Sequence, residues 1–258
     1  MNDTIYLDNK DSITRTMQDI TMTFAGKRKV ISTSALNGGI RTDLKAAFNH
    51  CDKDPKSGQC DMHGATYREH LAYAAKQLGY DAATVTGLST AAMMKYADVR
   101  KASFGGYTVT VVVTGGVYSN GRRAGETATM WEQDEVYHVL EGEGRTSGTV
   151  NLMVHINAHL SDGALATVMM VATEAKTATI RDLQIKSCYS KELSSGSGTD
   201  GIIVVSDEES EIYLTAAGTD TKLGECVARA VTQALREQLV MQEQYIRGEL
   251  KIKEVRWG

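Results

Sequence analysis

The sequence predicts an α+β protein in which mixed β-sheets are layered with helices. Glycine-bounded runs of β-branched residues indicate strands, and longer segments with apolar residues at helical spacing indicate helices. Strand-like and helix-like segments are interleaved, and some strands follow one another directly, which indicates antiparallel pairing. This mixture is typical of sheet and helix layers packed against each other.

The N-terminal third contains a predicted hairpin and two predicted helices. Residues 20–24 and 29–33 are strand-like on either side of Gly26, and the second strand leads into an Asn-Gly-Gly turn. Residues 67–78 carry apolar side chains at helical spacing and end at a glycine, so they predict a helix. A second helix is expected over 89–99, opened by a capping hydroxyl.

The remaining two thirds contain four predicted strands and two long helices. The strand segments are β-branched or alternate in polarity, and they are 107–114, 149–156, 201–205 and 211–215. We expect the last two to pair with each other. Ser161 and Asp162 supply capping oxygens before the first helix, and the second helix is expected over 221–247.

Composition limits the function classes. With 258 residues and no linker or internal repeat, we expect one domain over residues 1–258. A net charge of −4 without a basic stripe argues against a nucleic-acid partner. No apolar stretch approaches the roughly 20 residues that span a bilayer, and no signal peptide is visible, so we expect a cytoplasmic protein without a membrane partner. A homo-oligomer stays open.

The four cysteines do not predict a disulfide scaffold in a chain of this length. His50, Cys51, Cys60 and His63 together offer four zinc-ligand types, but their spacing matches no common zinc module. A free-thiol loop is the favoured interpretation, and we expect no metal and no cofactor.

Two charged residues follow a helix that is apolar on nearly every side. Glu174 and Lys176 come directly after the run 164–172, and burying such charges is costly unless they have partners. They are therefore site candidates, unless the helix surfaces there and water solvates both. At i and i+2 they would not face each other directly.

Three other local patterns are chemically suggestive. Asp200 follows a Gly/Ser loop at the mouth of a strand, where a substrate can approach closely. The turn at Asn37 offers converging amide donors for an oxyanion, although a plain turn explains the local sequence better. Thr149, Ser197 and Thr199 each follow a glycine, as do the nucleophiles of self-processing hydrolases.

Seven motifs occur in colinear order over roughly residues 20–240. They are SALNGG (34–39), VTGGVYSNGRRAGE (113–126), GTVN (148–151), INAHLSDGALA (156–166), TEAK (173–176), SGSGTDG (195–201) and TKLGECVARAVTQAL (221–235). In this wording and order the chain resembles the adenosylcobinamide amidohydrolase family of corrinoid salvage. The resemblance implies hydrolysis of the amide between the corrin propionyl side chain and aminopropanol, giving adenosylcobyric acid, with a small-molecule corrinoid as the partner.

Two positions depart from the family pattern. Gly121 replaces the alanine of a similar Asn-Ala-x-Arg-Ala-Gly motif, and Asp220 stands where a histidine is expected. Any role for position 220 is therefore in doubt.

The residues and the resemblance together predict one site. The predicted catalytic residues are Asn37, His50, Glu174, Lys176 and Asp200. The predicted substrate-binding residues are Gly38, Gly39, Thr114, Asn120, Arg123, Asn151 and Thr199. We expect Asn37, the Glu174–Lys176 segment and Asp200 to line a single cleft.

Two alternatives to this amidohydrolase stay open. GTVN followed by a strand and a helix also resembles self-processing amidohydrolases and β-peptidyl aminopeptidases, which have two sheets between two helix layers. That resemblance makes an αββα sandwich the expected fold. The other alternative is a corrinoid-binding protein without catalysis.

Overall fold

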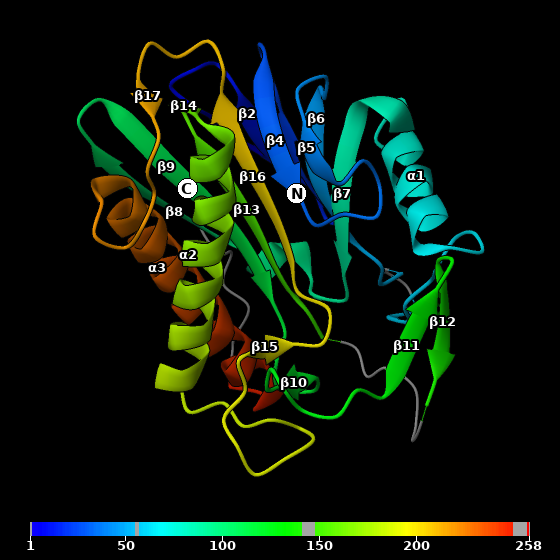
Figure 1. Ribbon diagram of the computed structural model, residues 1–258. Coiled ribbons are helices and arrows are strands. Elements are labelled where there is room, and N and C mark those ends of the chain that lie inside the picture. Colours follow the sequence, from blue (N-terminus) through cyan, green and yellow to red (C-terminus); the bar gives the residue numbers. More distant parts are fainter. Residues whose placement is uncertain (1, 55–56, 141–147, 250–256, 258) are drawn as a thin grey trace.

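Two β-sheets lie face to face, and helices cover the outer face of each, giving four layers in the order α–β–β–α (Figure 1). The computed structural model describes residues 2–54, 57–140, 148–249 and 257. Mixed sheets layered with helices confirm the predicted α+β class.

The first sheet has five strands in the order β1-β2-β3-β6-β7. Only the β6–β7 pair is parallel, so the carboxyl ends of these two strands lie together at one edge. The strands are β1 (Asp3–Tyr6), β2 (Ser12–Arg15), β3 (Asp19–Thr23), β6 (Ala46–Cys51) and β7 (Val85–Thr90).

The second sheet has six strands in the order β5-β4-β16-β13-β9-β8. Its central pair, β13–β16, is parallel and the other pairs are antiparallel. The strands are β4 (Arg28–Ser32), β5 (Gly39–Arg41), β8 (Asp98–Phe104), β9 (Tyr107–Gly115), β13 (Val150–Ile156) and β16 (Gly201–Asp207).

Each helix starts with a side-chain cap. A capping box of Thr66 and Glu69 opens α1 (Tyr67–Gln77), Ser161 caps α2 (Asp162–Asp182), and Thr221 caps α3 (Lys222–Ile246). Helices α2 and α3 pack on the second sheet, whereas α1 packs on β6 and β7 (Figure 1). None of the helices in the described part of the chain is long and apolar enough to cross a bilayer.

Short elements complete the fold. They are the 3-10 turns η1 (Ala82–Thr84) and η2 (Met94–Tyr96), and three two-stranded ladders: β10 (Gly121–Arg122) with β15 (Gly196–Ser197), β11 (Met130–Gln133) with β12 (Val136–Val139), and β14 (His159–Leu160) with β17 (Tyr213–Leu214).

The strongly apolar sequence of strand β13 is explained by burial of both its faces. Val150, Leu152, Val154 and Ile156 belong to the core between the second sheet and its helices. Met153 points the other way, into the core between the two sheets. Both faces of the strand are therefore buried, and the predicted alternation places its apolar set against the helices.

Three sequence predictions about secondary structure are wrong. The stretches 20–24 and 29–33 do not form a hairpin, because β3 and β4 belong to different sheets and the chain crosses the sandwich between them. The segment 89–99 is not a helix, since β7 ends at Thr90 and only η2 precedes β8. The segment 211–215 does not pair with β16, because β17 pairs with β14 instead.

A buried cluster of charges holds the crossing between β3 and β4. Arg28 donates from Nε to Asp11 Oδ2 at 2.7 Å and from its terminal nitrogens to Asp11 Oδ1 at 2.9 Å and Asp207 Oδ1 at 2.8 Å. His155 Nε2 contacts Asp11 Oδ2 at 2.8 Å, and the Ala25 N–H donates to Asp11 Oδ1 at 2.7 Å. Because these partners compensate the buried charge of Arg28, β4 can begin inside the second sheet instead of turning back to pair with β3.

The pKa of Asp11 reflects two opposing effects. Burial alone would raise it, but hydrogen bonds from His155, Arg28 and the Ala25 N–H outweigh burial and lower the pKa from 3.8 to about 2. A carboxyl group with a depressed pKa stabilises the fold above its unfolded pKa, and that stabilisation is lost as pH falls through the folded value.

We predict that Asp11→Asn lowers the free energy of unfolding at pH 7 by about 3–5 kcal/mol, because it leaves the buried guanidinium of Arg28 undercompensated. In the parent protein, stability on the order of 2 kcal/mol should disappear as pH falls from about 4 to about 2, and Asp11→Asn should lose less over that window. Urea unfolding followed by circular dichroism measures both.

Asp43→Asn is the matched control. Asp43 pairs with Arg41 at 2.7 Å, but 65% of its side chain is exposed to screening by water, so its loss should destabilise the fold far less than the loss of Asp11. Equal destabilisation by the two substitutions would contradict the role given to the buried cluster.

Candidate active site

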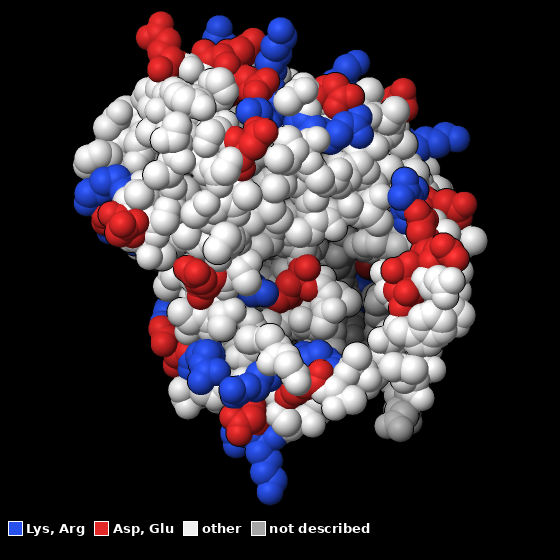
Figure 2. Space-filling view, in the orientation of Figure 1, with Lys and Arg blue, Asp and Glu red and all other residues white. Residues whose placement is uncertain are grey.

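A pocket of about 740 Å³ opens beside the last turns of α2. It lies between α2, the β10–β15 ladder and the β11–β12 hairpin, and the molecular surface is hollowed there (Figures 1 and 2). Its size is typical of a small-molecule site.

A buried ion pair forms one wall of this pocket. Lys176 on α2 donates from Nζ to Asp200 Oδ2, and the two side chains are only 9% and 11% exposed. Lys176 and Thr173 are three positions apart, so they lie on the same face of α2, and both line the pocket. Thr177 lines it as well. The lysine charge thus has a partner 24 residues further along the chain.

The Asp200 carboxylate accepts hydrogen bonds from three elements. Besides Lys176, the Ser197 hydroxyl donates to Oδ1 at 2.6 Å, the Ser197 N–H at 3.1 Å, and the Val150 N–H at 2.9 Å. The carboxylate therefore fixes the start of β13, the loop before β16 and the inner face of α2 relative to one another.

Gly196 is required by this close approach. A Cβ placed there would lie 2.2 Å from Asp200 Oδ2 and 2.8 Å from Lys176 Nζ. The glycines of SGSGTDG thus include one that leaves room for the ion pair.

Hydroxyl groups surround the ion pair on one side. Thr149 Oγ1 lies 2.7 Å from the Thr199 carbonyl oxygen, to which it donates, and 2.6 Å from Thr199 Oγ1. Thr199 also reaches the Gly148 carbonyl oxygen, as does the Asn120 side-chain amide at 2.9 Å. These contacts hold the GTVN segment against the loop that carries Asp200.

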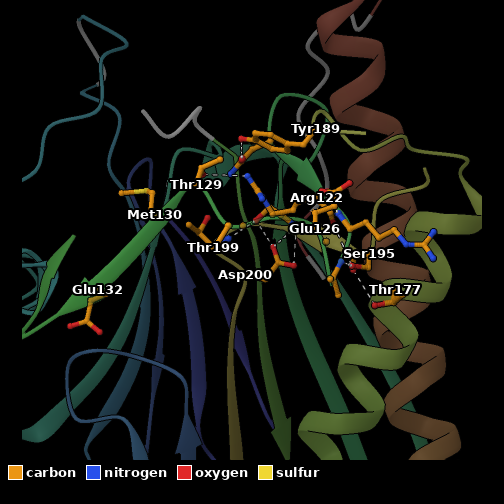
Figure 3. Close-up of a pocket in the computed structure, with 18 of the residues that line it drawn as sticks. Arg122, Glu126, Thr129, Met130, Glu132, Thr177, Tyr189, Ser195, Thr199 and Asp200 are labelled. Atoms are coloured by element: carbon orange, nitrogen blue, oxygen red, sulfur yellow. Dashed lines mark hydrogen bonds between the residues drawn. The ribbon is translucent and has the colours of Figure 1, made fainter. Parts of the chain in front are cut away.

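The opposite rim carries cations and an aromatic ring. The Arg122 guanidinium stacks 3.8 Å from the centre of the Tyr189 ring, whose hydroxyl donates to Asn120 Oδ1 at 3.2 Å (Figure 3). Arg123 pairs with Glu192 at 2.8 Å. Amides and guanidinium groups of this kind suit a ligand edged with amides.

Glu126 fixes the loop that holds this rim. Burial would raise the pKa of Glu126, but hydrogen bonds from the Ser190 and Ser187 hydroxyls and the Arg123 N–H lower it. The carboxylate is thus a stable acceptor that ties the loop after β10 to the segment 187–190.

The β11–β12 hairpin forms the third wall and exposes apolar side chains. Trp131 stacks on its cross-strand partner His138 with ring centres 4.4 Å apart, and 45% of Trp131 is exposed. Met130, Tyr137 and Val139 also line the pocket. An exposed apolar group beside a polar floor is typical of a ligand site.

Five of the predicted site residues line this pocket: Asn120, Arg123, Lys176, Thr199 and Asp200. Glu174 is not among the lining residues, because its side chain is exposed on another face of α2. Lys176 and Glu174 are thus separated by helix geometry, in agreement with their i, i+2 spacing.

The Asn-Gly-Gly turn lies outside the pocket lining. Asn37 donates from Nδ2 to the carbonyl oxygens of Ala82 and Val85, each at 2.7 Å, so both amide hydrogens serve the backbone. Gly38 packs against the Ser34 carbonyl oxygen, and Gly39 adopts a φ of +78°. These contacts brace the turn and lend no support to Asn37 as an oxyanion donor.

Thr114 and Asn151 are buried between the two sheets rather than exposed in the pocket. Asn151 donates to Asn49 Oδ1 at 2.8 Å and to the Ser89 carbonyl oxygen at 2.9 Å, and Asn49 donates to Thr114 Oγ1 at 2.8 Å. This network joins β6 and β7 of the first sheet to β9 and β13 of the second.

His50 also lies apart from the pocket lining, at the end of β6. Its Nδ1 contacts Asp19 Oδ1 at 2.7 Å, and its ring lies 5.7 Å from that of His70.

The β11–β12 hairpin and Tyr189 line the pocket but were not predicted as site residues. The turn residues Asp134 and Glu135 both have positive φ, which suits a two-residue hairpin turn, and alternating residues flank them. That signal was present in the sequence. Tyr189 is placed by contacts with distant residues and had no comparable signal.

The chain is similar to several known proteins. A protein of Methanocaldococcus jannaschii described as "Uncharacterized protein MJ1613" is 32% identical over 239 residues, covering 90% of both chains. Two solved structures are similar at low identity. The PH0078 protein from Pyrococcus horikoshii OT3 is 11% identical, with a TM-score of 0.43 over 93% of this chain and 83% of that one. A β-aminopeptidase from Burkholderia sp. is 12% identical, with a TM-score of 0.42 over 88% and 80%.

The family model described as adenosylcobinamide amidohydrolase (CbiZ) matches residues 4–246, nearly the whole chain. The protein therefore belongs to the adenosylcobinamide amidohydrolase family.

Proposed function

We propose that the protein hydrolyses the amide between aminopropanol and the corrin propionyl side chain of adenosylcobinamide. The products are adenosylcobyric acid and 1-amino-2-propanol. Family membership supports the hydrolase class. The observation that carries the site assignment is the buried Lys176–Asp200 pair, which faces a pocket large enough for the amide-bearing arm of a corrinoid.

The roles follow from the chemistry of amide cleavage. The attacking oxygen must lose a proton, the carbonyl oxygen gains negative charge, and the leaving amine needs a proton. We assign to Asp200 acceptance of a proton from the attacking water and its return to the leaving amine, and to Lys176 stabilisation of the negative charge on the carbonyl oxygen. The Ser197 hydroxyl donates to Asp200 Oδ1 at 2.6 Å, so it can relay a proton to the carboxylate.

The substrate body is assigned to the other two walls. Asn120, Arg122 and Tyr189 offer polar contacts to the amide-rich rim of a corrin, and the β11–β12 hairpin offers an apolar surface for its flat face. Binding on remote walls holds the scissile amide against the ion pair, which is how positioning contributes to rate.

We predict that Asp200→Asn lowers kcat for adenosylcobinamide by about 10²-fold or more, because it removes proton acceptance while keeping the side-chain shape. Lys176→Met should lower kcat similarly. Mass spectrometry of adenosylcobyric acid measures turnover, and equilibrium dialysis measures whether the corrinoid still binds.

Asp182→Asn is the matched control, because Asp182 lies on the same helix in an exposed pair with Arg236. It should keep kcat within about twofold. If Asp200→Asn binds corrinoid and retains parental kcat, the assignment of Asp200 is wrong. If parental protein binds corrinoid without any turnover, the corrinoid-binding alternative replaces the proposal.

A second prediction concerns the hairpin. Trp131→Ala should raise KM by about tenfold with little change in kcat, because it removes a stacking surface without touching the ion pair. Tyr213→Ala removes an aromatic side chain on β17 that is 57% exposed and should leave KM unchanged. An unchanged KM for Trp131→Ala would place the corrin elsewhere.

The third prediction concerns the integrity of the chain. Hydrolysis without self-processing leaves one species of 28.0 kDa, whereas cleavage before Thr149, Ser197 or Thr199 yields two fragments. We expect the single species on a denaturing gel and in intact mass measurement. A clean pair of fragments in active protein would favour the self-processing alternative.

A further inference from the structure

Three side chains with metal-ligand chemistry meet at the carboxyl edge of the parallel β6–β7 pair. His50 is the penultimate residue of β6, Asp52 follows that strand, and His70 comes from α1, which covers β6 and β7 (Figure 1). One ligand atom from each lies within 4.8 Å of the other two. None of the three lines the pocket described above.

The cluster is built into the fold rather than spread over its surface. The His70 side chain is fully buried, and those of His50 and Asp52 are 13% exposed. His70 Nε2 lies 2.8 Å from Asp52 Oδ1, and Ser89 at the end of β7 donates to Asp52 Oδ2 at 3.0 Å. The backbone of two strands and one helix therefore fixes all three candidate ligands.

His50 already has the tautomer that a metal ligand needs. Its Nδ1 lies 2.7 Å from Asp19 Oδ1, and since a carboxylate only accepts, Nδ1 carries the hydrogen. The Nε2 lone pair is then directed away from Asp19. A carboxylate behind a ligating histidine is the usual orienting arrangement at metal sites.

His70 requires one rearrangement. Its Nδ1 accepts the His63 N–H at 3.1 Å, so Nε2 carries the proton that is shared with Asp52. A metal ion at Nε2 would displace this proton and leave the ring's hydrogen on Nδ1. The His63 contact must therefore open on binding, and His63 itself lies in neither a helix nor a strand.

The donor set selects the class of ion. Two imidazole nitrogens and one carboxylate suit divalent first-row transition metals, whereas Mg²⁺ and Ca²⁺ prefer oxygen ligands alone. Zinc bonds of about 2.0–2.2 Å hold tetrahedral ligand atoms about 3.4 Å apart, a separation that lies within the 4.8 Å limit of this cluster.

We propose that His50, Asp52 and His70 bind one divalent transition-metal ion, with zinc as the reference ion and Asp19 orienting His50. This site shares only His50 with the set of His50, Cys51, Cys60 and His63 considered from the sequence. Neither Cys51 nor Cys60 belongs to the group of described side chains whose ligand atoms lie within 4.8 Å of one another. The proposal stands independently of the reaction at the pocket.

The ion would stabilise the edge of the first sheet. It would join the ends of β6 and β7 to α1, and through Ser89 to Asn151 of β13. Binding to the native state alone raises the melting temperature with metal concentration.

The test uses tag-free full-length protein loaded with Zn²⁺ and passed over a desalting column. We expect one zinc per chain by elemental analysis, a visible d–d spectrum after Co²⁺ substitution, and no retention of Mg²⁺. Zinc should also raise the melting temperature by several degrees.

Two variants keep the fold while removing a ligand. Asp52→Asn can still accept from His70 and contact Ser89, and His50→Asn can still donate to Asp19. Each should weaken zinc binding at least about tenfold and abolish the thermal shift, with the metal-free melting temperature close to the parental one. Cys60→Ser, an exposed neighbour, should bind zinc as the parental protein does.

Parental protein that retains less than about one-tenth of an equivalent of zinc overturns the proposal. Zinc lost in Cys60→Ser but retained in Asp52→Asn also overturns it, by moving the site to the thiol loop. Neither result bears on the amidohydrolase assignment, which is tested by turnover at Asp200.

Discussion

The arrangement of the site depends on the interactions of the buried Asp200 carboxylate. A buried carboxylate is costly without partners, and Asp200 has Lys176, Ser197 and the Val150 N–H. These donors come from a helix, a loop and a strand that are remote in sequence. Satisfying one carboxylate therefore sets the distance between α2 and the ends of β13 and β16, and the pocket opens where these elements meet. Removing either charge leaves the other buried, so the pair couples the chemistry of the site to its shape.

Where burial and local pattern agree, the sequence predicted the structure well. β13 and α2 were recognised because a strand with two buried faces and a helix in the core both leave strong apolar periodicity. β3 and β4 were misjudged as a hairpin because the chemistry that separates them is not local. Arg28 draws its strand into the second sheet through Asp11 and Asp207, and no pattern near Gly26 reports that pairing.

The site was predictable in part for the same reason. Lys176 and Asp200 were found because charges beside apolar segments are conspicuous, although nothing local showed that they pair with each other. Glu174 is also a charge beside an apolar segment, yet its side chain is exposed to solvent. Which of Glu174 and Lys176 is buried depends on how α2 packs on the sheet. Asn37 was predicted as an oxyanion donor, but its side-chain amide donates to the carbonyl oxygens of Ala82 and Val85. These contacts depend on how the turn packs, which the local sequence does not show.

Strand β13 links the pocket to the second polar cluster through two successive residues. The Val150 N–H serves Asp200, while the Asn151 side chain crosses the sandwich to the Ser89 carbonyl, and the Ser89 hydroxyl serves Asp52. Because successive residues of a strand point to opposite faces, one strand end can hold polar groups in both layers without exposing its apolar core. The two clusters therefore lie at the same edge of the sandwich for a structural reason. Strand ends are where backbone and side-chain polar groups can be satisfied together, and that is where this fold concentrates its charged chemistry.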